Sequence, residues 1–180
     1  MNIKHLILTV IIILGFGCTP KQRTNVNNGL SLEIVPHDYE TGQLFINTNQ
    51  NFYLLIKNNT GKDVKIWEDW CSYGYFAPSF DVKFKSGESI HITKNDTAWT
   101  RNFPDSFILK SSGSYVIAVN LESSFKESQK LLDNLSNVTE IKANYGIKSS
   151  DKQKKYNVWY GEISTDFQKA EFHRTLTENN

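Results

Sequence analysis

The chain has 180 residues, with 20 basic and 19 acidic side chains and a formal net charge of +1. This length suits a single domain, and a charge so close to zero gives no long-range field that would imply nucleic acid as a partner. Four tryptophans, eight tyrosines and eleven phenylalanines are ample material for a core, which excludes a disordered chain. Ten glycines and two cysteines are too few for a collagen-like protein or a disulfide framework.

The N-terminal segment 1–17 has the pattern of a secretory signal peptide. One basic residue, Lys4, precedes an apolar run from Leu6 to Leu14, and small residues follow that run. A membrane-spanning helix needs about 20 apolar residues, so the run is too short for the alternative, a membrane anchor. We expect segment 1–17 to be removed from the mature protein.

The small residues that end in Gly17 and Cys18 resemble the lipobox of bacterial lipoproteins. The resemblance implies that the thiol of Cys18 is acylated, with palmitate among the usual chains, and that Cys18 becomes the new N-terminus. Thr19 stands where an aspartate would resemble a signal for inner-membrane retention, which implies the outer membrane of a bacterial cell envelope. Several acyl chains, at ~0.8 kcal/mol per buried methylene, make such an anchor stable.

The segment 18–29 is polar and ends on turn-forming residues, so we expect a flexible tether between the lipid and the domain. Cleavage removes Lys4 and no acidic residue, which leaves the mature chain with no net charge. Its only other thiol is Cys71. Since a single cysteine cannot form an intramolecular disulfide, the domain must be held together by packing alone.

From Leu30 onward, apolar residues alternate with polar ones, which is the period of half-buried strands. Turn-forming residues interrupt the alternation at intervals typical of a β-sandwich. We therefore expect one all-β domain over 30–173, with eight or nine strands. Its expected strands are marked by Leu30–Ile34, Phe52–Ile56, Val64–Ile66, Phe80–Phe84, Ile90–Ile92, Phe107–Leu109, Tyr115–Leu121, Ile141–Ile147 and Val158–Ile163.

Three segments of the expected domain depart from this alternation. Segment 122–137 has apolar residues at helical spacing among helix formers, which predicts one short amphipathic helix. Segment 148–155 is charged and lacks apolar residues, so we expect a mobile, solvated hairpin tip. Segment 174–180 has no pattern, and we expect a disordered tail.

The stretch from Ile141 to Ile147 resembles the strand of immunoglobulin-like domains in which a small residue precedes a corner tyrosine by two positions. The resemblance implies a β-sandwich in which the hydroxyl of Tyr145 bonds to nearby backbone and Ile147 replaces a disulfide cysteine. From Phe52 to Ile163, the order of short motifs is similar to that of small immunoglobulin-like domains of uncharacterised bacterial lipoproteins. That family implies no particular reaction.

Segment 67–76 holds five aromatic residues and a thiol within ten positions. One interpretation is that Trp67 lies in the core and the rest forms a loop packed over one end of the sandwich. The other is that Tyr73, Tyr75 and Phe76 form a partly exposed surface that binds sugar rings, a peptide or a partner protein. We expect Cys71 to be a buried, inert thiol.

No residue pattern in the chain indicates a catalytic or metal site. The three histidines beyond the signal peptide, His37, His91 and His173, lie in separate expected elements, and none has a recognisable spacing with Cys71. Zinc-ligand pairs, calcium loops, phosphate-binding loops and nucleophile elbows are all missing from the sequence. We therefore expect a protein that is not an enzyme and uses no metal or cofactor.

The triplet Asp96-Thr97-Ala98 resembles the acceptor for O-glycosylation of exported proteins in some Gram-negative groups, which implies a glycan on Thr97. The alternative is an ordinary polar turn.

These observations predict a lipid-anchored envelope protein that acts as a non-enzymatic binding or accessory module, with a protein or glycan as its partner. Two alternatives remain open. The domain could be a protease-inhibitor-like sandwich that presents segment 67–76 or 98–104 to a protease, or a structural subunit of an envelope complex.

Overall fold

The computed structural model describes residues 24–25, 29–35, 43–99 and 103–175. Within them the chain is predominantly β, as the alternation of the sequence predicts. Its strands are β1 (Thr24–Asn25), β2 (Leu30–Val35), β3 (Leu44–Asn47), β4 (Phe52–Asn58), β5 (Val64–Trp67), β6 (Pro78–Phe84), β7 (Ser89–Thr93), β8 (Ser106–Leu109), β9 (Ser114–Val119), β10 (Val138–Ile147), β11 (Gly161–Thr165) and β12 (Gln168–His173). The helices are α1 (Ser72–Tyr75), α2 (Leu121–Ser124), α3 (Ser128–Leu132), α4 (Asp151–Tyr156) and the 3₁₀ helix η1 (Leu135–Asn137).

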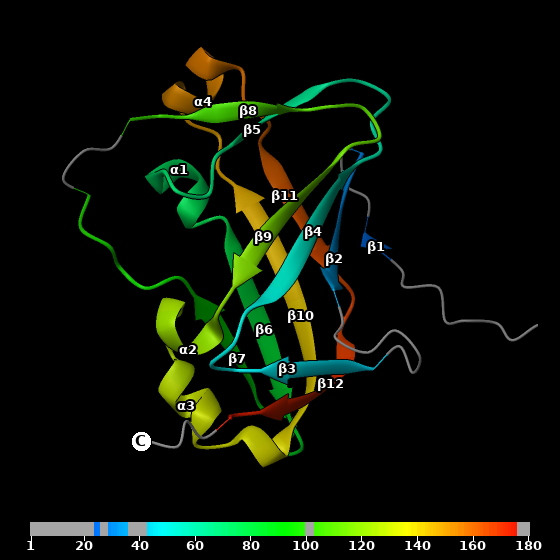
Figure 1. Ribbon diagram of the computed structural model, residues 1–180, viewed down its shortest axis with the longest axis vertical. Coiled ribbons are helices and arrows are strands. Elements are labelled where there is room, and N and C mark those ends of the chain that lie inside the picture. The colour runs from blue at the N-terminus through cyan, green and yellow to red at the C-terminus, as the bar shows by residue number, and fades with distance from the viewer. Residues whose placement is uncertain (1–23, 26–28, 36–42, 100–102, 176–180) are drawn as a thin grey trace, which may run out of the picture.

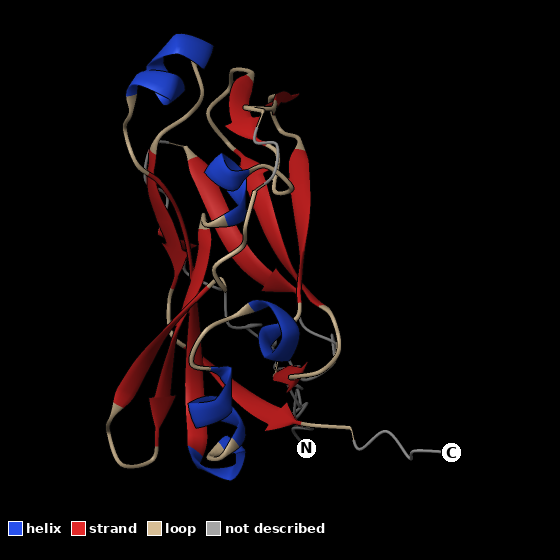
Figure 2. Cartoon of the chain, turned by 90° about the vertical axis from the view of Figure 1, so that its left-hand side faces the viewer, coloured by secondary structure: helices blue, strands red, loops and turns tan. Residues whose placement is uncertain are grey.

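The strands form two layers that lie face to face (Figure 1). The larger sheet is built around β10, which pairs with β6 along one edge and with β11 and β12 along the other. The second sheet has the order β2-β4-β9 and is antiparallel throughout. A separate antiparallel pair, β5-β8, lies at one end of the molecule together with α4 (Figures 1 and 2).

The core fills the space between the two layers, because alternate residues of the facing strands point inward. Phe52, Leu54 and Ile56 of β4 are buried, and the ring of Phe52 meets that of Phe80 from β6 at 5.7 Å. Phe80 in turn contacts Phe125, at the end of α2, with ring centroids 5.3 Å apart. One chain of aromatic contacts therefore joins both sheets to the helical segment.

The prediction of a mobile hairpin tip at 148–155 is wrong, because α4 forms there. Ser150 caps the helix by accepting a hydrogen bond from the backbone N–H of Gln153, and Asp151 adds an acid to the first turn. Asn157 ends the helix in a left-handed conformation, with φ 51°. Gln153 is the buried residue of this helix, and Tyr156 at its end packs against the core.

The single helix predicted over 122–137 is divided into α2, α3 and η1. Phe125 interrupts it, because this side chain is buried and its backbone forms a β-bridge with Lys94. The N–H of Lys126 donates to the carbonyl of Thr93 at 2.7 Å, which reinforces the interruption. Glu127 then adopts a φ of 62° before α3 begins.

Three strands were not predicted, namely β1, β3 and β12. β3 and β12 pair in parallel, with Leu44 opposite Ala170 and Asn47 opposite His173. The ordered chain also continues into the segment expected to be a tail, because Arg174 forms an ion pair with Glu122. Residues 176–180 lie outside the described residues.

The hydrogen bond implied for a corner tyrosine is not present. Tyr145 points into the core with 1% exposure, but its hydroxyl has no hydrogen-bond partner within the described chain. The inward direction of Ala143 and Ile147 agrees with the expected strand. The feature that distinguishes an immunoglobulin corner is therefore missing, while the half-buried strand itself is present.

The expected signal peptide 1–17 and Cys18 lie outside the described residues. Within the expected tether, Thr24 and Asn25 form the short strand β1 against Thr165 and Ser164, so this part is paired rather than free. Among the described helices, none combines the length and the apolar character that a membrane crossing requires.

Candidate binding surface and pocket

The segment from Trp67 to Phe76 leads from β5 into α1. It contains both core residues and surface residues. Trp67 is 1% exposed, and its ring contacts those of Tyr73 at 5.0 Å and Tyr156 at 5.6 Å. The thiol of Cys71 is buried, as predicted, with Sγ 3.2 Å from the carbonyl oxygen of Glu68. This half of the segment is therefore part of the packing.

A glycine holds α1 against the preceding loop. A Cβ built on Gly74 would stand 2.2 Å from the carbonyl oxygen of Glu68 and 3.1 Å from Cβ of Trp67. No side chain fits at such a distance, so the close approach requires glycine. The backbone N–H of Gly74 also donates to the carbonyl of Cys71 at 3.0 Å. These contacts fix the direction in which the residues after Gly74 point.

The three residues expected to form a binding surface lie in different environments. Tyr73 packs on Trp67 and against the core, which makes it a structural residue rather than a free ring. Tyr75 is half-buried, and its ring contacts Phe76 at 4.9 Å and Trp99 at 5.6 Å. Phe76 is 46% exposed. We call Tyr75, Phe76 and Trp99 the aromatic surface.

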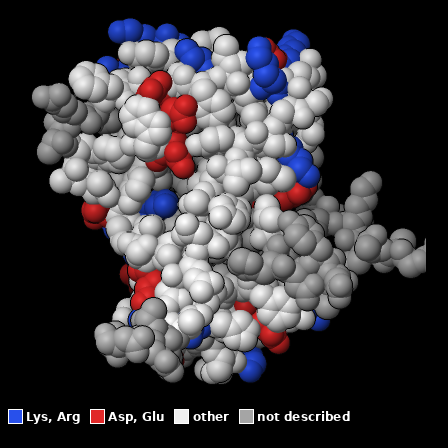
Figure 3. All heavy atoms as spheres, in the orientation of Figure 1, with Lys and Arg blue, Asp and Glu red and all other residues white. Residues whose placement is uncertain are grey.

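Three carboxylates, those of Glu68, Asp69 and Asp105, lie beside α1, in the loop before that helix and directly before β8. The pKa of Glu68 is raised by burial and by the negative charges of Asp105 and Asp69. Within the described residues, none of the three takes part in an ion pair, and the exposed indole of Trp70 follows Asp69 directly. Figure 3 shows a group of acidic side chains on the face that carries α1 and β9 in Figure 1.

Lys94 connects the aromatic surface to the core. Its ammonium group lies 5.1 Å from the ring centre of Tyr75 and 4.5 Å from that of Phe125. Burial lowers the pKa of Lys94, while the charge of Asp69 opposes that shift. A lysine held over two rings in this way connects Tyr75 to the buried Phe125.

Thr97 lies in the loop after β7 and is exposed. Its Oγ1 donates a hydrogen bond to the hydroxyl of Tyr75 at 3.2 Å, and the neighbouring Asp96 pairs with Lys126 at 2.7 Å. A glycan on Thr97 would therefore stand next to the aromatic surface. Glycosylation of Thr97 stays a prediction.

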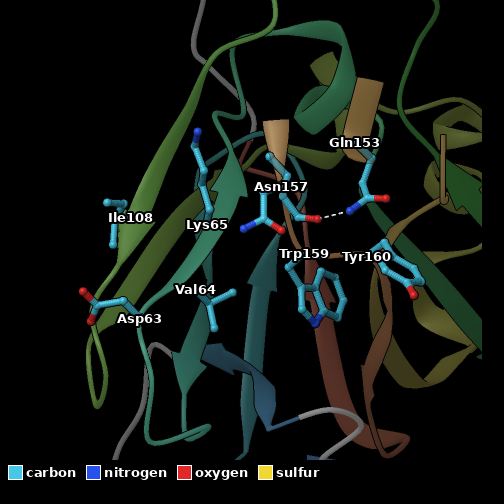
Figure 4. Close-up of a pocket in the computed structure, with 9 residues that line it drawn as sticks. Asp63, Val64, Lys65, Ile108, Gln153, Asn157, Trp159 and Tyr160 are labelled. Carbon is cyan, nitrogen blue, oxygen red and sulfur yellow. Dashed lines mark hydrogen bonds between the residues drawn. The ribbon is translucent and has the colours of Figure 1, made fainter. Parts of the chain in front are cut away.

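A pocket of about 660 Å³ opens at the end of the molecule where β5, β8 and α4 meet. Figure 4 shows Asp63, Val64, Lys65 and Ile108 on one side of it and the residues from α4 to the start of β11 on the other. The full lining consists of Asp63, Val64, Lys65, Ile108, Gln153, Asn157, Val158, Trp159 and Tyr160. None of these residues was predicted from the sequence to be a site residue. The helix cap at Ser150 and the adjacent aromatic residues Trp159 and Tyr160 are nevertheless sequence features that could have indicated a site here.

The absence of a catalytic or metal-binding role for the three histidines remains a prediction. Nδ1 of His91 is 2.7 Å from the carboxylate of Asp81, in a surface pair on β6 and β7. Nε2 of His173 is 3.7 Å from Glu171 on the same strand. His37 lies outside the described residues. Among the residues that the structure describes, no three acidic, histidine or cysteine side chains come together as metal ligands.

We compared the chain with protein-family models, curated proteins and solved structures, and it matches none of them.

Proposed function

We propose that this protein is a lipid-anchored, non-enzymatic binding module of a bacterial cell envelope, and that the aromatic surface captures a protein partner. The observation that carries the proposal is the exposure of Phe76, a member of the aromatic surface, and of the nearby Trp70 beside three carboxylates that form no ion pair among the described residues. Phe76 is 46% exposed and Trp70 is 56% exposed, in a domain whose core contains many fully buried aromatic and aliphatic side chains. Exposed rings that adjoin polar groups are typical of interaction sites.

The anchor part of the proposal rests on the sequence alone. The basic residue Lys4, the apolar run and the Gly17-Cys18 pair support processing as a lipoprotein. An anchored domain meets its partner at a membrane surface, where a moderate affinity suffices because the effective concentration is high. A small, rigid surface such as Tyr75, Phe76 and Trp99 is adequate for such contacts.

The charge of the surface limits the chemistry of the partner. Asp69 and Asp105 lie close enough to raise the pKa of Glu68, and the combined negative charge of the three carboxylates disfavours an acidic partner. A protein segment that carries Lys or Arg beside an apolar residue would neutralise the carboxylates and cover the rings.

We also propose an immunoglobulin-like relationship for the domain, supported by its two layers and by the inward-facing Ala143, Tyr145 and Ile147.

The anchor and the surface are tested separately. Cys18→Ser is expected to abolish incorporation of labelled palmitate and to leave the precursor unprocessed, and undiminished label would contradict the anchor. For the surface, anchored wild type and the variants Phe76→Ser and Tyr53→Ser are recovered from membranes by pull-down. Tyr53 is a matched exposed aromatic on β4, 42% accessible to solvent. The proposal expects a partner that Phe76→Ser loses and Tyr53→Ser retains, and equal recovery by all three would contradict it.

A further inference from the structure

The pocket at the end of the molecule has no residue in common with the aromatic surface, and the proposed function does not use it. We propose that this pocket is a carbohydrate-binding site that receives a pyranose ring. The inference stands independently of the proposed function, because it depends on other residues and is tested with other ligands.

The size and the lining of the pocket both fit this ligand class. A volume of about 660 Å³ lies within the range of roughly 300–1,000 Å³ that is typical of small-molecule sites. The lining combines two aromatic rings, two amides and two opposite charges, and only a few aliphatic residues. A sugar needs this mixture, because its C–H faces pack on aromatic rings while its hydroxyls need donors and acceptors at the ring edge.

The aromatic platform is already in place. The indole of Trp159 stacks on Tyr145 with ring centroids 6.1 Å apart and an interplanar angle of 27°, so one of its faces is supported from the core. The backbone N–H of Trp159 donates to the carbonyl of Lys65 at 2.7 Å, which ties the residue to β5. Tyr160 follows at the mouth of the pocket and is 56% exposed. A sugar therefore meets one fixed ring and one accessible ring.

Two polar atoms of the lining residues lack partners within the described chain. Gln153 is 4% exposed, and its Nε2 donates to the carbonyl of Val158 while its Oε1 accepts no hydrogen bond. Nε1 of Trp159 is buried and donates to no acceptor. A buried polar atom without a partner costs about 1–3 kcal/mol. Hydroxyl groups could satisfy both a free acceptor and a free donor, because each hydroxyl both donates and accepts a hydrogen bond. Both atoms are shielded without ligand. We expect the amide of Gln153 to turn toward the sugar on binding, while Trp159 stays held against Tyr145 and offers its ring face.

The rim supplies further polar contacts. Asn157 is exposed and held in a left-handed conformation at the end of α4, so its amide lies on a fixed backbone. Among the described residues, Lys65 takes part in no ion pair, which leaves its ammonium group free to donate. Asp63 pairs with Lys110 at 2.8 Å and accepts from the N–H of Ser111 at 3.1 Å. An ionised carboxylate accepts hydrogen bonds, so Asp63 can also accept from sugar hydroxyls without taking up a proton.

Two variants remove binding groups without endangering the fold. Tyr160→Ala removes an exposed ring, and the loss of one stacking contact is expected to weaken binding about tenfold. Asn157→Gly removes the amide at a position whose φ of 51° favours glycine, so the melting temperature should not fall. Tyr53→Ala is the control for an exposed aromatic elsewhere, and Phe76→Ala is the control for the aromatic surface.

The experiment titrates the full chain, purified in detergent, with methyl glycosides of glucose, galactose, mannose, N-acetylglucosamine and glucuronic acid and with a disaccharide of each. Saturation-transfer NMR identifies the sugars that bind, and indole N–H resonances identify the tryptophan that responds. We expect at least one sugar to shift the Trp159 resonance, with Tyr160→Ala and Asn157→Gly weakening that response and both controls leaving it unchanged. No response across the panel overturns the proposal, as does a response that both pocket variants leave intact. Failure here while Phe76→Ser still loses a partner would leave the proposed function standing.

Discussion

Gly74 and Glu68 approach each other so closely that a methyl group on Gly74 would lie 2.2 Å from the carbonyl oxygen of Glu68. This contact positions α1 against the loop that carries the acidic residues. It connects the buried half of segment 67–76 to the exposed half, and the orientation of the aromatic surface depends on it.

Gly74→Ala is therefore expected to destabilise the domain by about 1–3 kcal/mol, the usual consequence of overpacking a tight site. The loop after α1 must shift to accommodate the methyl group, so partner capture should also weaken. Thermal unfolding measures the first effect. An unchanged melting temperature would show that α1 does not depend on this approach.

A series of alanine substitutions distinguishes aromatic side chains of the core from those of the surface. Trp67→Ala removes a side chain that is 1% exposed and should cost roughly 3–5 kcal/mol. Tyr73→Ala removes the ring stacked on Trp67 and should have an intermediate effect, since Tyr73 is only partly buried. Phe76→Ala should leave stability within about 0.5 kcal/mol of wild type, as is usual for surface changes. Chemical denaturation of the three variants gives the order, and a large loss for Phe76→Ala would place this residue in the core.

Much of the fold follows from the alternation of apolar residues, because most strands bury one face on a common core. β3 and β12 were not found, since parallel pairing between segments more than a hundred residues apart leaves no local signal. α4 was missed for a different reason. Its polar sequence conceals a capped helix with one buried glutamine, although Ser150 and Asp151 form a normal N-terminal signal.

The candidate sites were less predictable than the fold. The aromatic composition of segment 67–76 left a packed loop and a partly exposed surface both open. Phe76 is exposed there, but no pattern placed Trp99 beside Tyr75. The pocket joins β5 and β8 to residues 153–160, which only the folded chain brings together. Sequence reasoning could assign residue types to strands and loops, but it could not determine which loops meet.

Tyr145→Phe distinguishes the observed core tyrosine from an immunoglobulin corner. Burial raises the pKa of Tyr145, and its hydroxyl has no partner among the described residues, so this oxygen destabilises the fold. The variant should be as stable as wild type or more stable, by up to about 2 kcal/mol. A loss of about 1 kcal/mol or more would instead indicate the corner hydrogen bond that the resemblance implies.

Glu68→Gln tests whether the acidic group costs stability. Burial, Asp105 and Asp69 raise the folded-state pKa of Glu68 above its unfolded value, so ionised Glu68 opposes folding above the folded pKa. Below the unfolded pKa of about 4.3, both states hold the proton and this effect disappears. Glu68→Gln should therefore raise the melting temperature slightly at pH 7 and leave it unchanged near pH 3. The increase is expected to be small, because solvent screens a partly exposed carboxylate.

The central claim, that the aromatic surface binds a protein partner from an anchored position, is tested most directly by photocrosslinking in intact cells. A photoreactive phenylalanine replaces Phe76 in one strain and Tyr53 in another, with the N-terminal segment and Cys18 retained in both. The account predicts one discrete crosslinked protein from position 76, lost when Trp99→Ala is added, and none from position 53. Equal crosslinking from both positions, or none from position 76, would contradict it.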